Sequence, residues 1–321
     1  MFETEITKLL GISHPVICGC MQWVTKAELV AAVGEAGGLG IIPAAAFESI
    51  EELEAEIDKT RNLTSKPFAV NVTLIPMGRP FSHEDMVRAA LGSGVKIIET
   101  AARSPEPYVD MIKEAGATLM HKCARVRDAL KAEKLGADMV TVVGHECGGH
   151  PGRQDVSTMV KVARAVSLLQ IPVAAGGGIV DGHGLVAALA LGAEAVVMGT
   201  RFFVTRESPV HDAIKEVMVQ ADETATSMVL TSLEPARALR NRVLGEIAEL
   251  EDKGAGIAEL YPLVAGKRGL RAYQKGDAED ALIPCGQGVG LIGDIPTVAE
   301  LMDRVMAQAT ETAGRLGALA S

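Results

Sequence analysis

Eight short runs of almost wholly apolar residues recur along the chain, and each leads through a loop into an amphipathic stretch of helical composition. The runs are HPVICG (14–19), LGIIPA (39–44), PFAVNVTL (67–74), VKIIETA (95–101), TLMHKC (118–123), MVTVVG (139–144), PVAAGG (172–177) and AVVMGT (195–200). Continuously apolar runs are typical of parallel strands covered on both faces. Eight alternating βα units fit a (β/α)8 barrel better than a doubly wound sheet of about five or six strands. We therefore expect an α/β fold of the TIM-barrel type.

The pattern stops after the eighth run. Residues 206–282 contain helical stretches such as EPARALRNRVLGEIAELEDKG, and no β-branched run bounded by turns stands among them. This composition predicts a helical second domain, an insertion or lid after the eighth strand. The loop IPCGQGVGLIGDIP (283–296) then leads into one more amphipathic helix. We expect residues 1–205 to form the barrel, and residues 283–321 to return to it and complete its ring of helices.

Charge and composition exclude several classes of protein. The chain has 31 Lys and Arg against 41 Asp and Glu, a net charge of −10, and only 3% aromatic residues. It lacks the basic and base-stacking surface of a nucleic-acid binder, and anionic membranes would repel it. No apolar run reaches signal-peptide or membrane-span length, and the five cysteines are an odd number. We expect a cytoplasmic protein without disulfides, whose partners are small molecules rather than nucleic acid or membrane.

The loops after the seventh and eighth runs are rich in glycine. They carry Gly177 and Gly178, and Gly199 followed by Thr200. Barrels often bind phosphate between these two loops, because glycine lets backbone N–H groups approach an anion and a helix N-terminus attracts it. The alternative is that these glycines only make tight turns. No G-x-G-x-x-G opens a helix after the first run, so the dinucleotide fingerprint is absent.

The loop GHECGGHPG (144–152) is the second chemical signal. Two glycines before His150 would let a flat ligand lie against the backbone, and imidazole is the natural proton carrier near neutral pH. The alternative is an ordinary surface histidine. Cys147 and His150 have C-x-x-H spacing, but no second ligand pair follows, so we expect no metal. A nucleophilic Cys147 is not favoured either, since no oxyanion motif accompanies it.

Lys122 ends the fifth run and should point into the barrel mouth, where an ammonium group would stabilise negative charge on a ligand. The alternative is a salt bridge to Glu99 or Glu146. His121 precedes it and must point the opposite way, so we interpret His121 as structural.

Taken together and in order, these stretches resemble the nitronate monooxygenase family (also called 2-nitropropane dioxygenase), whose members are FMN-dependent barrels with a helical second domain. The matching stretches include GCMQWV (19–24), PFAVNVT (67–73), HKCARVRDALKAEKLGAD (121–138), HECGGHPG (145–152), AAGGGIVDGHGLVAALALGAEAVVMGTRF (174–202) and GQGVGLI (286–292). The resemblance implies non-covalent FMN, with its phosphate on Gly177, Gly178, Gly199 and Thr200 and its ring against Met21, Gln22, Asn71, Lys122, Gly148 and Gly149. His150 matches the family histidine over the flavin, and Lys122 is the second catalytic candidate.

Within the family, MQWV, HKC and HPG are most similar to the NADH:quinone reductase branch. The main hypothesis is therefore an NAD(P)H:quinone reductase that uses NAD(P)H as co-substrate. A homodimer is the assembly that we consider for it. The alternatives are nitronate oxidation with O2, reduction of an enoyl thioester, and a barrel that binds flavin or phosphate without catalysis. Arg79, in the loop PMGRP (76–80), motivates a hypothesis of NADPH tolerance.

Overall fold

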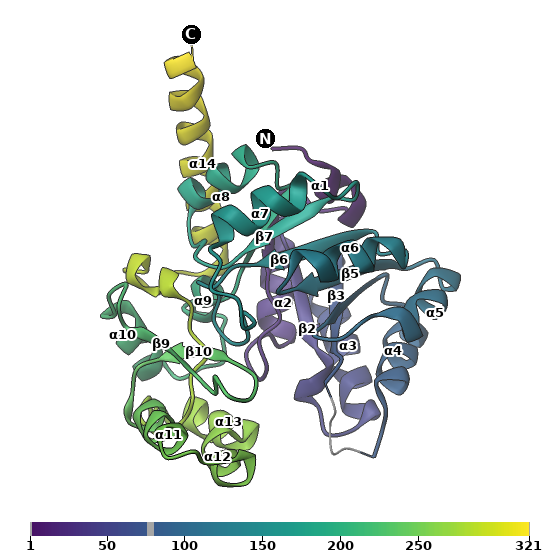
Figure 1. Cartoon of the computed structure of the whole chain (residues 1–321). Helices are drawn as coiled ribbons and strands as arrows, with labels where there is room; N and C mark the ends of the chain where they lie inside the picture. Colours follow the sequence, from purple (N-terminus) through teal and green to yellow (C-terminus); the bar gives the residue numbers. More distant parts are fainter. Residues whose placement is uncertain (1, 76–79, 321) are drawn as a thin grey trace.

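The computed structural model describes residues 2–75 and 80–320. Eight parallel strands close into a barrel in chain order, with β1 hydrogen-bonded to both β2 and β8 (Figure 1). The strands are β1 (Val16–Cys18), β2 (Leu39–Pro43), β3 (Phe68–Thr73), β4 (Ile97–Ala101), β5 (Thr118–Cys123), β6 (Met139–Val143), β7 (Val173–Gly176) and β8 (Ala195–Met198). Each lies within one of the apolar runs, so the predicted TIM-type barrel is confirmed.

Helices follow the strands and form the outer ring. They are α2 (Ala27–Glu35), α3 (Ile50–Leu63), α4 (His83–Gly92), α5 (Val109–Glu114), α6 (Val126–Lys134), α7 (Thr158–Val166) and α8 (Gly182–Ala190). A further helix, α1 (Glu5–Leu10), precedes β1. Two short 3-10 turns, η1 (Ala44–Ala46) and η2 (Glu106–Tyr108), lie in loops. The side chains of Ser49, Ser82, Ser157 and Asp181 each accept a hydrogen bond from the backbone N–H three residues later. These caps define where the loops above the barrel end.

Alternate side chains of the strands fill the barrel. The inward-facing residues nearer the strand starts are buried and apolar: Ile17, Leu39, Ile41, Ala69, Ile97, Met120, Met139, Ala174, Ala195 and Val197. Because side chains alternate with a period of two, the next inward positions on β3 to β6 lie at the C-terminal mouth. Those positions are polar, and they are Asn71, Glu99, Lys122 and Thr141. The barrel is therefore apolar below and polar at its mouth.

The segment after β8 contains strands as well as helices. Its elements are α9 (Thr200–Phe203), α10 (Asp212–Val219), β9 (Thr226–Val229), β10 (Ala236–Leu239), α11 (Arg242–Asp252), α12 (Ile257–Val264), α13 (Gly266–Lys275) and η3 (Gln287–Leu291). The prediction of a wholly helical segment therefore missed the antiparallel pair β9–β10. The β10 sequence ARAL consists of good helix formers, and pairing with β9, together with bridges to Gly149 and Pro284, keeps it extended.

The last helix, α14 (Val298–Ala320), packs against α8 and α2, so it occupies the place of an eighth ring helix. Its buried face includes Leu301, Val305 and Ala309, whereas residues 314–320 are exposed and project beyond the barrel (Figure 1). In the part of the chain that the structure describes, no helix is both long enough and apolar enough to cross a membrane.

Candidate active site

A buried polar pair spans β3 and β4 at the barrel mouth. Asn71 and Glu99 are partners in the register of the two strands, and each is 1% exposed. Asn71 Nδ2 donates to Glu99 Oε2 at 2.6 Å, and Thr73 Oγ1 donates to Asn71 Oδ1 at 2.8 Å. Burial raises the pKa of Glu99, while Lys122 and the Asn71 amide oppose that rise. The hydrogen bonds hold Asn71 in one orientation.

Lys122 points into the barrel without a close acidic partner. Among the described residues, no carboxylate lies within 4.0 Å of its Nζ. Glu146 instead accepts from the N–H and the hydroxyl of Thr158, at 2.9 and 3.0 Å. Burial is the largest single influence on the pKa of Lys122 and lowers it, but Glu99, Cys20 and Cys147 together outweigh burial, so the pKa is raised. Neither salt bridge that was considered forms, so the ammonium group is available to a ligand.

Three more groups border Lys122. Thr141 is its partner in the register of β5 and β6, and the buried Thr141 Oγ1 has no hydrogen-bond partner within the described chain. Cys20 and Cys147 both interact electrostatically with Lys122. Burial raises the pKa of Cys20 to about 12, so this thiol is neutral at pH 7 and is a poor nucleophile. A buried hydroxyl without a partner beside an unpaired ammonium group marks a place for a polar ligand group.

The glycine loops after β7 and β8 lie side by side, because these two strands pair. Gly177 and Gly178 have φ of +103° and +74°, a backbone conformation that glycine takes without strain. A Cβ built on Gly199 would meet only Met21 Sδ, at 3.7 Å. Thr200 is the first residue of α9. The two loops therefore present backbone and one hydroxyl, with little side-chain bulk, at the mouth.

Gly148 has a structural reason to be glycine. A Cβ at this position would lie 2.8 Å from both Cys285 C and Gly286 N of the returning chain. Gly286 N–H in turn donates to Thr200 Oγ1 at 3.0 Å. Close approach of the two backbones thus ties the β6–α7 loop to the segment that follows α13.

His150 is held by the segment after β8. Its Nδ1 lies 3.1 Å from the carbonyl oxygen of Pro235. A carbonyl oxygen only accepts hydrogen bonds, so Nδ1 carries the proton in this contact. In the neutral ring, Nε2 is then the acceptor, and the His150 side chain is exposed. This arrangement presents an oriented base to the solvent side of the mouth.

The whole loop that carries His150 is clamped by the β9–β10 hairpin (226–239). Gly149 and Arg237 exchange two backbone hydrogen bonds, at 2.9 and 2.7 Å. The Arg237 side chain is 4% exposed, and it donates from Nε to His145 O at 2.9 Å and from Nη1 to Thr226 Oγ1 at 3.1 Å. Arg153 also donates to the hairpin, through the carbonyls of 231 and 233.

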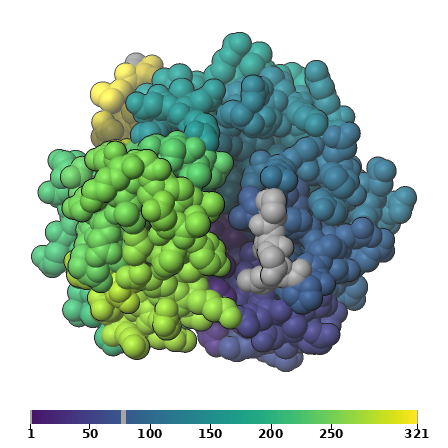
Figure 2. Space-filling view, turned by 60° about the horizontal axis from the view of Figure 1, so that its bottom comes forward, coloured from purple at the N-terminus to yellow at the C-terminus, as the bar shows by residue number. Residues whose placement is uncertain are grey.

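The segment after β8 touches the other side of the mouth through α13. A Cβ on Gly266 would lie 3.4 Å from Trp23 Nε1 and 3.5 Å from Gln22 Nε2. Lys267 and Glu48 form an ion pair at 2.7 Å. Figure 2 shows the cleft that remains between this segment, in green, and the blue and purple parts of the barrel.

The structure thus brings most of the predicted site residues to one mouth: Met21, Asn71, Lys122, Gly148, Gly149, His150, Gly177, Gly178, Gly199 and Thr200. Gln22 is exposed and turned toward α13. Arg79 lies outside the described residues. Sequence reasoning missed Thr141, although it stands two residues after inward Met139. It also missed Pro235 and Arg237, for which no local signal exists.

The fold is a TIM-type barrel with polar residues and glycine-rich loops at its C-terminal mouth, and the comparison with known proteins shows its family. The nitronate monooxygenase profile matches residues 3–85 and 76–308. The chain belongs to the nitronate monooxygenase family, and it is an enzyme of this family of FMN-dependent oxidoreductases.

Two curated relatives align over nearly the whole chain. A Rhodococcus jostii protein named (3aS,4S,5R,7aS)-5-hydroxy-7a-methyl-1-oxo-octahydro-1H-indene-4-carboxyl-CoA dehydrogenase is 33% identical, over 99% of this chain and 98% of its own. A probable nitronate monooxygenase of Staphylococcus saprophyticus is 33% identical, over 98% and 99%.

Two solved structures are similar along their full length. FabK from Thermotoga maritima has 37% identity and a TM-score of 0.93, covering 99% of this chain and 100% of its own. A nitroalkane oxidase from Streptomyces ansochromogenes has 25% identity and a TM-score of 0.82, covering 97% and 99%.

The residues at the mouth fit the flavin that the family implies. The positive φ values at Gly177 and Gly178 give a backbone cradle that excludes side chains. The unsatisfied Thr141 hydroxyl and the unpaired Lys122 supply polar donors inside the same mouth. This donor set suits a phosphate together with an electron-poor ring.

Proposed function

We propose that the protein is an FMN-dependent nitronate monooxygenase, which oxidises alkyl nitronates with O2. The hydrogen bond from His150 Nδ1 to Pro235 O carries this proposal, because it leaves Nε2 as an oriented acceptor. A neutral imidazole is suited to take a proton from a carbon acid near pH 7. Two of the relatives described above are named as a probable nitronate monooxygenase and a nitroalkane oxidase.

In this proposal the cofactor lies across the mouth. Its phosphate would be held by Gly177, Gly178, Gly199 and Thr200, and its ring by Met21, Asn71, Lys122, Gly148 and Gly149. When bound, FMN supplies a two-electron acceptor that reacts with O2. The Lys122 ammonium group stabilises negative charge beside it, and the apolar layer below the mouth keeps water out.

His150 has one of two roles toward the substrate. Its Nε2 removes the α-proton of a neutral nitroalkane, or the protonated ring holds an anionic nitronate by a charge-assisted hydrogen bond. His150→Ala separates the two roles. Loss of a general base lowers turnover of the nitroalkane by about 10²–10⁴-fold and spares the preformed nitronate. Equal loss for both substrates assigns the anchoring role. The matched control is His183→Ala, whose ring bonds Thr312 on the flank of the barrel at 2.8 Å.

The deciding experiment follows the flavin absorbance without oxygen in a stopped-flow instrument. An alkyl nitronate should bleach the flavin rapidly, whereas NADH and NADPH should not. Rapid bleaching by a nicotinamide nucleotide, with no response to nitronate, would overturn the proposal and favour a reductase.

Reduction of an acyl thioester is the second candidate. It is supported by the full-length similarity to FabK and to a protein named as a carboxyl-CoA dehydrogenase. An enoyl thioester would then restore the colour of the nicotinamide-reduced protein. None of the relatives described above is named as a quinone reductase, so that hypothesis stays a prediction, as do the use of NAD(P)H, the homodimer and the cytoplasmic location.

A further inference from the structure

One buried hydroxyl on a barrel strand has no hydrogen-bond partner. In the described part of the chain, seven buried side-chain N or O atoms are without a partner. Six of them belong to helices or loops, and they are His14 Nδ1, Trp23 Nε1, His83 Nε2, His145 Nδ1, Arg201 Nε and Ser208 Oγ. The seventh is Thr141 Oγ1, on β6. Native structures leave few buried polar groups unpaired, so this hydroxyl calls for a partner.

Burial by itself does not explain the missing partner. Five threonines among the described residues are 0% exposed, and Thr141 is one of them. The hydroxyls of the other four each have a partner at 2.8 or 3.1 Å, and these are Thr25, Thr60, Thr100 and Thr205. The fold therefore pairs its fully buried threonines elsewhere and makes an exception at Thr141.

The Thr141 side chain points into the barrel mouth. Alternation along β6 places it on the same inner face as Met139. Its register partners are Lys122 on β5 and Ala174 on β7. Alanine has no side-chain hydrogen-bonding atom, and Gly176, the next inward position of β7, has no side chain. The hydroxyl is thus bordered by an ammonium group on one side and by small residues on the other.

Thr141 and Lys122 together select an electron-rich acceptor. The Lys122 ammonium group has donors only, and among the described residues no carboxylate lies within 4.0 Å of its Nζ. A threonine hydroxyl beside a cation orients its oxygen toward the charge and its hydrogen toward an acceptor. The two groups therefore bind best to oxygen or nitrogen atoms that carry negative charge.

The ring of FMN has two unlike ends. Its dimethylbenzene end carries no hydrogen-bonding atom, whereas its pyrimidine end carries two carbonyl oxygens and ring nitrogens. The negative charge of the reduced ring spreads over the pyrimidine end. Donors on β5 and β6 therefore suit this end, and they bind it more strongly after reduction than before.

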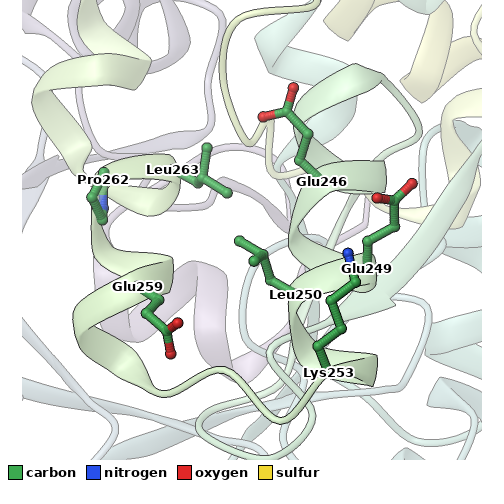
Figure 3. A pocket seen from close by; sticks show the side chains of 7 residues that line it. All are labelled: Glu246, Glu249, Leu250, Lys253, Glu259, Pro262 and Leu263. Carbon is green, nitrogen blue, oxygen red and sulfur yellow. The ribbon is translucent and has the colours of Figure 1, made fainter.

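Concavity alone does not mark such a place in this molecule. The hollow between α11 and α12 measures 360 Å³ and is lined by Glu246, Glu249 and Glu259 with Lys253 (Figure 3). Glu249, Lys253 and Glu259 are exposed, and none of the seven unpaired atoms lies there. Water can satisfy these charged groups, so this hollow has no buried group that needs a ligand.

We propose that Thr141 contacts the cofactor and raises the reduction potential of the flavin. Its hydroxyl donates to the pyrimidine end of the ring beside Lys122, and this hydrogen bond favours the reduced ring. The chain by itself supplies no partner for the hydroxyl, because the partner is the cofactor. The proposal rests on flavin binding, the part of the proposed function that nitronate oxidation and thioester reduction share.

Thr141→Val and Thr141→Ser test the hydrogen bond. Valine keeps the shape of the side chain without the hydroxyl, and serine keeps the hydroxyl. The reduction midpoint of the flavin-loaded protein is measured by equilibration with a dye of known potential. If Thr141→Val weakens binding of the reduced ring about tenfold more than of the oxidised ring, the reduction midpoint falls by about 30 mV. Thr141→Ser should match the unmodified protein, and an unchanged reduction midpoint in Thr141→Val overturns the proposal.

Thr100→Val is the matched control. Thr100 is also 0% exposed on a barrel strand, but its Oγ1 lies 2.8 Å from His121 Nδ1. This variant should leave the reduction midpoint unchanged and lower the thermal midpoint of the flavin-free chain. Thr141→Val should instead raise that thermal midpoint by about 2 °C, because it removes an unsatisfied buried group. A lower thermal midpoint for both variants would show that the Thr141 hydroxyl is already paired, and it would overturn the proposal.

FMN affinity decides the matter if Thr141→Val retains too little flavin for a potential. Loss of affinity in Thr141→Val but not in Thr141→Ser or Thr100→Val supports the contact, and equal loss in Thr141→Val and Thr141→Ser overturns it. None of these readouts involves a nitronate. Failure of a nitronate to bleach the flavin would therefore overturn the proposed function and leave this result intact.

Discussion

At the scale of single residues, Glu99 and Lys122 lie near each other at the barrel mouth without forming a salt bridge. Glu99 raises the pKa of Lys122 without approaching it within 4.0 Å. Glu99 is instead hydrogen-bonded to Asn71. The lysine therefore keeps donors for a ligand, while the nearby carboxylate favours the protonated form of this half-buried side chain.

Two substitutions test the cofactor residues directly. Gly178→Asp adds a negative charge to the proposed phosphate cradle, and Lys122→Ala removes the ammonium group, so both should lower the flavin content of the purified protein. Gly11→Asp is the matched control, because Gly11 has a similar φ of +68° and lies in open space. Flavin content is read from the visible absorbance after gel filtration. Normal content in both site variants would contradict the assignment.

His121 predicts how stability depends on pH. It is 3% exposed, its Nδ1 lies 2.8 Å from Thr100 Oγ1, and burial lowers its pKa to about 4. The unfolded chain, with a pKa near 6.5, binds the proton more readily. The neutral His121 therefore contributes up to about 3 kcal/mol to the free energy of unfolding. This contribution is complete above about pH 6.5 and is lost as the pH falls from there through 4.

The check is the urea midpoint of the flavin-loaded protein between pH 7 and pH 4.5. His121→Gln should show a smaller acid loss than the unmodified protein, whereas His183→Gln, which is exposed, should follow the unmodified protein. Parallel pH profiles for all three proteins would refute the prediction.

At the scale of elements, the β9–β10 hairpin acts on the chemistry from a distance. It supplies the carbonyl that orients His150 and the two backbone hydrogen bonds that hold Gly149. The β6–α7 loop is therefore a joint structure of the barrel and the segment after β8. Changes in the hairpin should alter the catalytic step more than flavin binding.

Arg237→Met is the corresponding prediction. It leaves His145 O and Thr226 Oγ1 without their donors, so the loop loosens and kcat should fall about tenfold while flavin content stays normal. Arg240→Met is the control, since Arg240 directly follows the hairpin, is exposed, and its side chain donates one long hydrogen bond, of 3.4 Å, to Thr226 O. If both variants lowered kcat equally, Arg237 would have no specific role in positioning the loop.

At the scale of the whole molecule, one long helix closes the ring and then leaves it. Leu301, Val305 and Ala309 of α14 are buried, whereas residues 314–320 are exposed. The core of the barrel therefore depends on the first part of α14 only.

Removal of the chain from Gly314 onward should change the thermal midpoint by no more than about 1 °C, since it exposes no buried surface. Leu301→Ala should cost about 2–5 kcal/mol of unfolding free energy, because it leaves a cavity between the ring helices. Thermal scans with and without added FMN provide the check. A large loss on truncation would show that the projecting end is covered in solution.

The sequence by itself determined the barrel, since strand runs, helical stretches and caps are properties of neighbouring residues. It also determined the glycine loops and the inward direction of Lys122, which follow from strand order and from the period of two. The same alternation, applied to Met139, would have found Thr141.

Only the tertiary structure decided the extended state of ARAL in β10, the tautomer of His150 and the contacts of Arg237. His150 and Pro235 are 85 positions apart, and Arg237 lies 92 positions from its acceptor at His145. No local propensity encodes such a contact, because it exists only after the barrel has closed and brought the two backbones together. The physical reason is that pairing between distant segments depends on packing, whereas periodicity and turn chemistry act within a few residues.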